Sequence, residues 1–179
     1  MTSTRAKLPY PVGRQKPDAE LAKNVRKALP NMAFETAETT TDTDFIVQPA
    51  DLLVFVTTLK ERRELSFDFF RNLAGVDLIE TMALKYHLYS FKHGHACQIT
   101  VPTAAGHPHV PSLTPLYPTA NWHEREASEM FGFVFDGHPN PGNLLLEEDL
   151  HIHPLLKAHP LQAAEILQGL EDREPGFKF

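Results

Sequence analysis

Four charged side chains lie within six positions in a stretch that is otherwise rich in aromatic residues: Glu124, Arg125, Glu126 and Glu129. Two carboxylates act together as acid and base only when they face one another, and on a helix Glu124 and Glu126 point about 200° apart. Arg125 and Glu129 are four residues apart, which allows an ion pair on a helix surface. The spacing therefore argues against catalysis by two facing glutamates in this helix.

The same charged stretch has two open interpretations. It is either a solvated helix face or a docking surface, in which a partner supplies the counter-charges and donors that buried charges need. Trp122, Phe131 and Gly132, with prolines on both sides, fix the helix in one orientation and favour docking. The neighbouring Phe133 and Phe135 either fill the core or, with Phe131, form the edge of an interface.

Histidines at alternate positions are the main signal for a different class of protein. They form three pairs: His93/His95, His107/His109 and His151/His153. Residues i and i+2 of a strand share a face, which is usable geometry for metal ligands. The alternative is therefore a stand-alone His-rich metal-binding module or metallohydrolase. Against it, each pair lies at a turn or beside a proline, and no H-x-H-x-D-H or H-E-x-x-H pattern completes a site, so we expect no metal ligands.

Other cofactors and nucleophiles have little support in the sequence. Cys97 is the single cysteine, so the chain cannot by itself hold an iron–sulfur cluster or a Cys-type zinc site. Its place inside an expected strand predicts a buried, inert thiol. Neither G-x-G-x-x-G nor G-x-x-x-x-G-K-[ST] occurs, and G-x-S-x-G is also missing. We expect no catalytic residue and no cofactor on this chain.

Length and charge restrict the remaining classes. The chain has 179 residues, of which 42% are hydrophobic, and this suits one domain with a real core. Residues 1–30 carry seven basic and two acidic side chains, whereas residues 31–179 carry ten basic and twenty-one acidic ones. An acidic body repels nucleic acid. Since the longest strongly apolar run is residues 52–56 and no signal peptide is visible, we expect a soluble, cytosolic chain.

Hydrophobic periodicity predicts the elements of the first half. Residues 1–17 are basic and rich in proline, which favours an extended arm. Asp18 is a plausible N-cap for a helix that ends before Pro30. Two short strands are expected around Thr39 to Asp44. The apolar pattern of residues 52–64 then predicts another helix.

The middle of the chain predicts a short helical piece followed by a hairpin. Phe67, Phe69, Phe70 and Leu73 are read as a continuation of helix before Gly75. Residues 82–90 alternate, turn at 92–94 and return through 95–101, which indicates a β-hairpin. Since no long βαβ rhythm appears, we predict an α+β single domain in which helices pack on one face of an antiparallel sheet.

Proline and glycine punctuate the second half. An ordered proline-rich connector over 102–118 leads to a helix that begins at Thr119 and ends at Phe131, with Gly132 as its left-handed stop. The rest is expected to be irregular apart from a short helix around 161–170. The predicted divisions are an extended basic arm over 1–17, the α+β domain over 18–135, and an irregular docking extension over 136–179.

The charged helix and the residues after it resemble the signature of one family. The matching positions are Asn121, Trp122, Glu124, Arg125, Glu126, Glu129, Met130, Phe131, Gly132, Phe135, Gly137, His138 and Pro139. The pattern is similar to that of the thirty-kilodalton subunit, also called the C subunit, of proton-pumping NADH:quinone oxidoreductase, respiratory complex I. The same domain occurs in related energy-converting, membrane-bound nickel–iron hydrogenases and formate hydrogenlyases. The resemblance is strongest over 112–160.

The resemblance implies a non-catalytic subunit of an oxidoreductase complex that couples electron transport from NADH to quinone, or hydrogenase chemistry, to proton translocation. It implies docking on the large subunit, which is related to hydrogenase large subunits, and contact with the adjacent iron–sulfur subunit. Iron–sulfur clusters, and flavin or nickel–iron, are then expected on partner subunits, and the chain is expected to be peripheral on the cytoplasmic side of the membrane. The expected interface residues are Trp122, Glu124, Arg125, Glu126, Glu129, Phe131, Gly132, His138, Pro139 and Lys157.

Two segments depart from the family pattern. Where complex I members typically read His-Pro-Asp-Leu-Arg-Arg, this chain continues from Pro139 with Asn140-Pro141-Gly142-Asn143 and lacks both arginines. Where they read Pro-Leu-Arg-Lys-Asp-Phe-Pro, it has Leu156-Lys157-Ala158-His159 and keeps only the lysine of the charged set. Bidentate guanidinium contacts cannot form at these positions, which favours a divergent, hydrogenase-type member.

Overall fold

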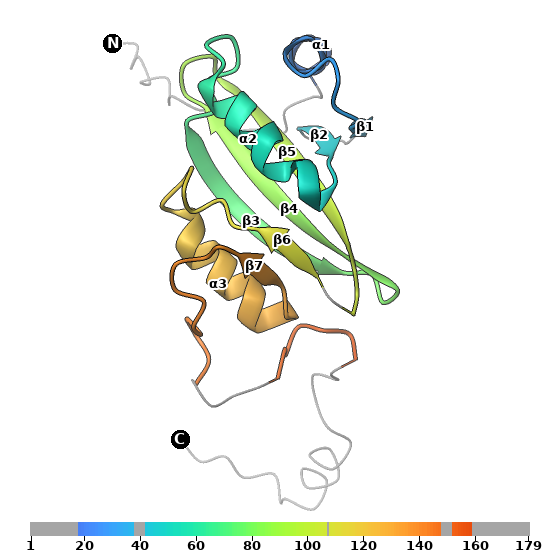
Figure 1. Cartoon of the computed structure of the whole chain (residues 1–179), viewed down its shortest axis with the longest axis vertical. Helices are drawn as coiled ribbons and strands as arrows, with labels where there is room; N and C mark the ends of the chain where they lie inside the picture. Colours follow the sequence, from blue (N-terminus) through green and yellow to red (C-terminus); the bar gives the residue numbers. More distant parts are fainter. Residues whose placement is uncertain (1–17, 38–41, 107, 148–151, 159–179) are drawn as a thin grey trace, which may run out of the picture.

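The computed structural model describes residues 18–37, 42–106, 108–147 and 152–158, and a five-stranded sheet forms its centre (Figure 1). The strand order is β1-β2-β5-β4-β3. The strands are β1 (Glu35–Ala37), β2 (Thr43–Ile46), β3 (Phe69–Asp77), β4 (Thr81–Ser90) and β5 (His95–Ala104). Neighbouring strands are antiparallel except β2 and β5, which are parallel. The predicted hairpin is the β4–β5 pair.

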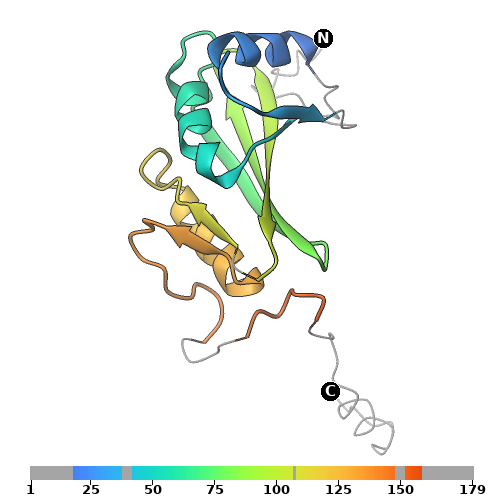
Figure 2. The same ribbon diagram turned by 45° about the vertical axis from the view of Figure 1, so that its right-hand side comes forward.

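The helices of the described residues pack on one face of this sheet (Figure 2). They are α1 (Ala19–Ala28), a 3-10 turn η1 (Pro49–Asp51), α2 (Leu52–Glu61) and α3 (Ala120–Phe131). In β4 the side chains of Leu84, Tyr86 and Leu88 are fully buried toward the helices, whereas Lys85 and His87 between them are only partly buried. This period of two is what a strand with one covered face requires. The α+β prediction is confirmed.

The N-terminal helix begins where the sequence predicts it. The Asp18 carboxylate accepts hydrogen bonds from the backbone N–H groups of Glu20 (2.9 Å) and Leu21 (3.1 Å), which satisfies two donors that a helix start leaves free. The Asp18 N–H donates to Thr43 Oγ1 at 2.8 Å and ties the helix start to β2. The predicted strands on both sides of residues 38–41 are β1 and β2.

The predicted helical piece over Phe67 to Leu73 is wrong, because these residues lead into and form β3. A β-bulge interrupts the pairing of β3 with β4 between Phe70 and Asn72. The extra residue makes Phe70 and Leu73 both face the core, three positions apart, which imitates helical spacing. Phe69 is also not a core residue, since it is 42% exposed and packs on the ring of Phe91.

A second, two-stranded sheet was not expected from the sequence. It pairs β6 (His109–Pro111) with β7 (Val134–Asp136) in parallel. Three-residue strands beside prolines leave too little periodicity to detect. The pairing brings the residues after α3 back onto the chain before it, and it places Phe133 and Phe135 in the core, which decides between the two interpretations of these residues.

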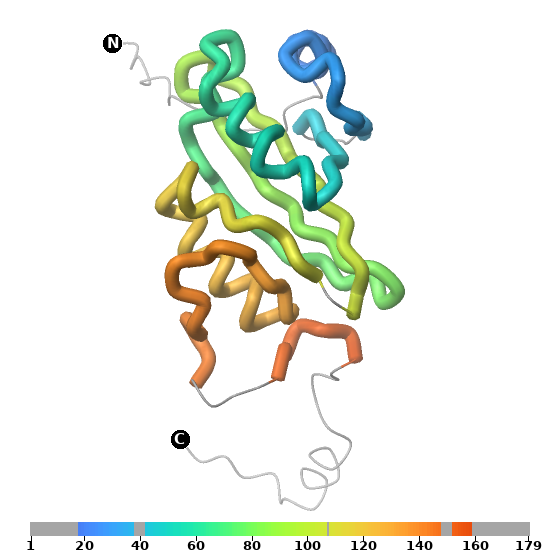
Figure 3. Tube along the Cα trace, viewed as in Figure 1, coloured from blue at the N-terminus to red at the C-terminus, as the bar shows by residue number. Residues whose placement is uncertain are grey.

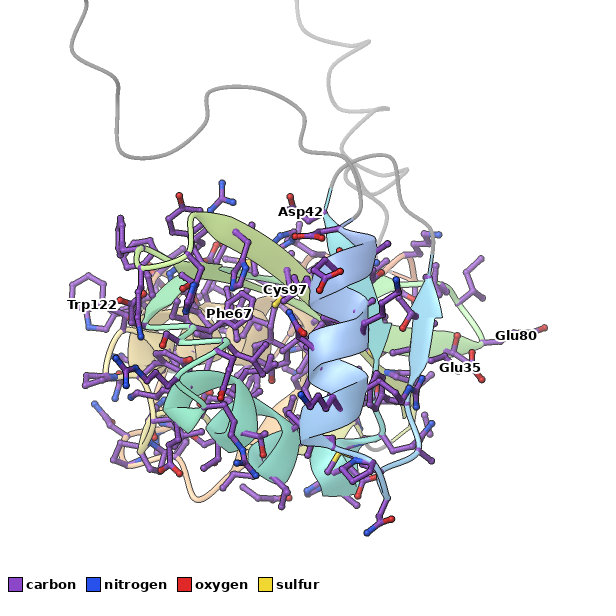
Figure 4. The ribbon with its side chains drawn as sticks, turned by 90° about the horizontal axis from the view of Figure 1, so that it is seen from above. Glu35, Asp42, Phe67, Glu80, Cys97 and Trp122 are labelled. Atoms are coloured by element: carbon purple, nitrogen blue, oxygen red, sulfur yellow. The ribbon has the colours of Figure 1, made fainter. Side chains whose placement is uncertain are left out.

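The core lies between the large sheet and the helices. The rings of Phe34, Phe45 and Phe55 pack against one another with centroids 5.2 to 5.8 Å apart. Figure 4 shows Cys97 and Phe67 inside the molecule, and burial raises the pKa of the Cys97 thiol well above its ordinary value, as expected for an inert cysteine. The predicted arm over 1–17 and helix over 161–170 lie outside the described residues, and the division at residue 135 stays a prediction.

Candidate functional site

Helix α3 lies close against β3, and a glycine makes that approach possible. A Cβ atom at Gly75 would lie 2.5 Å from the Phe131 ring, which is shorter than any real contact. The helix ends at Gly132, whose φ of 80° is in the left-handed region, as the sequence predicts. Thr119 is the N-cap residue, although its side chain makes no capping hydrogen bond. The charged stretch therefore forms a helix that is fixed on the domain.

Glu124 is the most buried charged residue of this helix, with no exposed surface. Its carboxylate accepts hydrogen bonds from Ser112 Oγ (2.6 Å) and from the backbone N–H of Leu113 (2.7 Å). Burial nevertheless raises the pKa of Glu124 from 4.5 to about 7, and these two hydrogen bonds act in the opposite direction. The chain before α3 thus supplies the donors that the docking interpretation assigned to a partner.

Two further polar side chains lie near Glu124. His138 Nδ1 accepts a hydrogen bond from the backbone N–H of Asn140 (3.0 Å), so the ring proton is on Nε2, which donates to the carbonyl of Asn121 (3.1 Å). That nitrogen lies 3.9 Å from Glu124 Oε2. The Tyr86 hydroxyl is buried and has no hydrogen-bond partner in the described part of the chain. Burial, with the charge of Glu124 as a second cause, raises the pKa of Tyr86 well above its ordinary value.

Glu129 holds the loop that follows β7. Its carboxylate accepts hydrogen bonds from three successive backbone N–H groups, those of Leu144 (2.8 Å), Leu145 (3.1 Å) and Leu146 (3.2 Å). Only 4% of the residue is exposed. Three donors pointing at one carboxylate make a strong, geometrically specific contact. The donors of this buried charge also come from the same chain.

Arg125, one helical turn before Glu129 on α3, also holds this loop. Its Nε donates to the carbonyl of Gly142 at 2.7 Å, and its Nη2 donates to the carbonyl of Asn143. The predicted ion pair between Arg125 and Glu129 is wrong, because each side chain is engaged by a different part of the loop and they form no salt bridge with each other. The Arg125 guanidinium thus binds the carbonyl groups of Gly142 and Asn143, the two positions at which the family pattern has arginines.

The segment over 152–158 crosses the C-terminal end of α3 and reaches the end of β3 (Figure 3). His153 Nδ1 lies 2.9 Å from the carbonyl oxygen of Glu129, and the N–H of Leu155 donates to the carbonyl of Met130 (3.1 Å). The N–H of Lys157 donates to Asp77 Oδ2 at 2.8 Å. These contacts hold residues 152–158 on the domain.

The expected interface residues therefore separate into two groups. Glu124, Arg125 and Glu129 bind the chain's own loops, Phe131 packs on Gly75, and the side chain of His138 is only 2% exposed. Trp122 is 68% exposed and projects outward from the molecule in Figure 4. Glu126, Pro139 and Lys157 are exposed as well. Contact of either group with another polypeptide stays a prediction.

We call Trp122, Glu126 and Pro139 the Trp122 surface. Glu126 is one helical turn after Trp122 and lies beside it on α3. Pro139 follows His138, whose Nε2 donates to the carbonyl of Asn121, the residue before Trp122, at 3.1 Å. The buried carboxylates and the Arg125 guanidinium fasten the helix and the following loop to the domain, so this surface is presented in one fixed arrangement.

Sequence reasoning missed three residues of this region. Ser112 and Asp77 are small polar residues in a connector and at a strand end, and their roles depend on segments 12 and 80 residues away along the chain. Tyr86 is one of several inward residues of β4. The one usable signal was Gly75, because a glycine inside a strand often marks close approach of another element.

The alternative interpretation of the sequence was a metal site formed by pairs of histidines. The rings of His93 and His95 stack with centroids 5.4 Å apart, and their Nε2 atoms lie 2.9 and 3.0 Å from the carbonyl oxygens of Arg63 and Leu65. His107 and His151 lie outside the described residues. Over the described ranges, no group of three or more His, Cys, Asp or Glu side chains could hold a metal ion. None of the helices described there has the length and apolar character that a membrane crossing needs.

Comparison with known proteins agrees with the signature around α3. The family model "Respiratory-chain NADH dehydrogenase, 30 Kd subunit" matches residues 45–165. The C subunit of the NADH-quinone oxidoreductase of Roseiflexus sp. strain RS-1 is 38% identical over 152 residues, which cover 83% of this chain and 87% of that one. Its counterpart from Roseiflexus castenholzii is 39% identical over 145 residues, covering 79% and 83%.

Two solved structures share the fold. A chain of the membrane-bound sulfane sulfur reductase, an archaeal respiratory membrane complex, superposes with a TM-score of 0.71 at 19% identity and covers 89% of this chain and 95% of that one. A trypsin-resistant fragment of Nqo5 gives 0.56 at 21% identity and covers 67% and 98%. Because the family model spans more than half of the chain, and the Roseiflexus relatives exceed 30% identity over most of both chains, the chain belongs to the family of 30 kDa subunits of respiratory-chain NADH dehydrogenase.

Proposed function

We propose that the chain is a cofactor-free, non-catalytic subunit of a membrane-associated, proton-translocating respiratory oxidoreductase complex. In this proposal it docks on the large, hydrogenase-related subunit through the Trp122 surface, next to the iron–sulfur subunit, on the cytoplasmic side of the membrane. Family membership supports the complex, and the relatives' name, which makes them subunits of NADH-quinone oxidoreductase, supports the kind of chemistry in which the complex takes part.

One observation carries the docking role. Trp122 is 68% exposed, and it lies on α3, which hydrogen bonds to the following loop hold in one orientation. Tryptophan is among the residues that contribute most when they fill a pocket at the centre of an interface. Glu126 beside it is exposed and offers a carboxylate to a basic group of the partner. This composition suits a protein contact better than a catalytic site.

The buried charges of α3 also support the proposal, although their hydrogen-bond partners lie in the chain itself and not in a partner subunit. Since Glu124, Arg125 and Glu129 are satisfied inside the chain, the helix and its flanking loops do not have to be ordered when a partner binds. A surface that is already in its bound arrangement loses less entropy on association. We infer that these three residues position the docking surface.

The cysteine content supports the cofactor-free role. Cys97 is the single cysteine, it is fully buried in β5, and its thiol holds its proton tightly because burial disfavours the thiolate. An iron–sulfur cluster needs several cysteine thiolates, and this sequence has a single cysteine. Electron-carrying groups of the complex therefore belong to its other subunits in this proposal.

The test is co-expression of the tagged chain with the large subunit of its complex, followed by purification and titration of the two proteins. Trp122→Ala should weaken binding about 30-fold or more, the loss typical of a central interface residue, and Glu126→Ala less. Val54→Ala is the matched control, because Val54 is 58% exposed on α2, away from α3. Equal affinity of the Trp122→Ala, Val54→Ala and unchanged chains would refute docking through this surface.

A further inference from the structure

The turn between β3 and β4 exposes two large aliphatic side chains. Leu78 is 55% exposed and Ile79 is 70% exposed. The turn extends beyond the body of the sheet in Figure 1, and Figure 4 shows Glu80, the next residue, at the opposite side of the molecule from Trp122. We call Leu78 and Ile79 the hairpin tip. It is separate from the Trp122 surface.

The backbone of the hairpin tip is in a conformation that isoleucine disfavours. Ile79 has a φ of 77°, in the left-handed region where a β-branched side chain crowds its own backbone. Glycine or asparagine adopts that conformation with less strain and is usual in such turns. Since Ile79 is also mostly exposed, neither turn geometry nor core packing accounts for an aliphatic side chain at this position.

Hydrogen bonds hold the hairpin tip in this strained form. The Ile79 N–H donates to Asp77 Oδ1 (2.7 Å), and the Leu78 N–H donates to the carbonyl of Thr81 (2.9 Å). The other oxygen of Asp77 accepts the N–H of Lys157 (2.8 Å), so the segment over 152–158 braces the turn. The two aliphatic side chains are thus presented on a rigid support, as a preorganised contact requires.

We propose that Leu78 and Ile79 form an apolar knob that inserts into an apolar pocket of another protein, and that basic side chains at the rim of this pocket meet Glu80. The proposal rests on the proposed function in that the partner is a subunit of the same complex other than the large subunit, because the hairpin tip lies at the opposite side of the molecule from the Trp122 surface. The exposed Glu80 carboxylate selects for a basic rim. It disfavours an anionic lipid surface, and it disfavours a second copy of the chain, because two acidic tips repel.

The direct test places a photo-crosslinking amino acid at position 79 in the complete chain, expressed in cells that assemble the complex. Position 54 on α2 receives the same group as the control. We expect one crosslinked partner at 79 that co-purifies with the complex, is identified by mass spectrometry as another of its subunits, and is not crosslinked from 54. No crosslink, the same products from both positions, or only crosslinked pairs of this chain would overturn the proposal.

Substitutions separate the hairpin tip from the fold and from the Trp122 surface. Ile79→Gly relieves the left-handed strain, so the isolated chain should keep or raise its melting temperature, whereas its affinity for the crosslinked partner should fall about tenfold or more as the buried side chain is lost. Glu80→Lys should weaken the same contact, and less so at high salt. The proposal would be contradicted if both variants lost binding only because they unfold. It would also be contradicted if both stayed folded and bound the partner as tightly as the unchanged chain.

Two controls distinguish failure of this proposal from failure of the proposed function. Trp122→Ala should leave the crosslink from position 79 to its partner intact when that partner is supplied as the purified subunit, whereas Ile79→Gly should leave binding of the large subunit unchanged. Co-sedimentation with phosphatidylglycerol vesicles should be negligible for the unchanged chain. Sedimentation that Ile79→Gly abolishes would assign the hairpin tip to a membrane and overturn the protein contact.

Discussion

Replacing Glu124 by glutamine should change how the stability of the domain depends on pH. Burial raises the pKa of Glu124 from 4.5 to about 7, so the folded chain holds this proton more tightly than the unfolded chain does. The stability that the protonated form provides is complete below about pH 4.5 and is lost as pH rises through 7. A pKa difference of this size between the folded and the unfolded chain corresponds to about 3 kcal/mol of unfolding free energy.

Glutamine is the informative substitution because it keeps the shape and removes the charge. Its carbonyl accepts the Leu113 N–H, and its amide can donate to Ser112 Oγ, which also lies 2.8 Å from Thr114 Oγ1. Between pH 5 and pH 8 the unfolding free energy of Glu124→Gln should therefore rise relative to the unchanged chain by about 3 kcal/mol at most. Glu124→Ala is the contrasting variant, since it leaves the Leu113 N–H buried without a partner at every pH.

Urea unfolding followed by far-ultraviolet circular dichroism at several pH values measures this difference. Tryptophan fluorescence is a poor probe, because Trp122 is the single tryptophan and is already exposed. Burial lowers the pKa of His87 and His95, which favours the folded state as pH rises through 6.5 in both proteins and cancels in the comparison. Parallel curves for the two proteins from pH 5 to 8 would refute the claim that burial shifts Glu124.

Three further predictions concern the contacts that fix α3. Gly75→Ala should cost about 1–3 kcal/mol of unfolding free energy, measured by urea titration, because its Cβ would overlap the Phe131 ring; unchanged stability would contradict the close approach. Gly132→Ala should lower the melting temperature by several degrees, since alanine must adopt φ near 80°. Glu129→Ala should increase hydrogen–deuterium exchange of the amides over 144–146, which Glu129→Gln should partly restore; protection that persists in Glu129→Ala would show that other contacts hold the loop.

The parts of the fold that local signals determine were predictable. The cap at Asp18, the alternation that becomes β4 and the stop at Gly132 each depend on a few neighbouring residues, and all three are confirmed. The helix expected after Phe67 failed because a bulge in β3 reproduces helical spacing. Nothing local distinguishes the two patterns, since the bulge depends on pairing with β4.

The sequence predicted which segment forms the candidate site, but it did not predict the contacts within that site. The sequence drew attention to Glu124, Arg125 and Glu129, yet their partners are backbone groups 11 to 18 residues away on loops without periodicity. Such contacts exist only after tertiary folding, so spacing suggested an Arg125–Glu129 pair instead. Trp122 was expected at an interface from its residue type and its place in the signature, and the structure leaves it 68% exposed.

Hydroxyl-radical footprinting read by mass spectrometry tests the docking claim most directly, by comparing the oxidation of Trp122 in the isolated chain and in the assembled complex. Trp122 should be oxidised readily in the isolated chain, in keeping with its 68% exposure, and should be protected in the complex, while Val54 reacts equally in both. Equal oxidation of Trp122 in the two states would contradict the account, because the surface that it assigns to a partner would then face water in the complex.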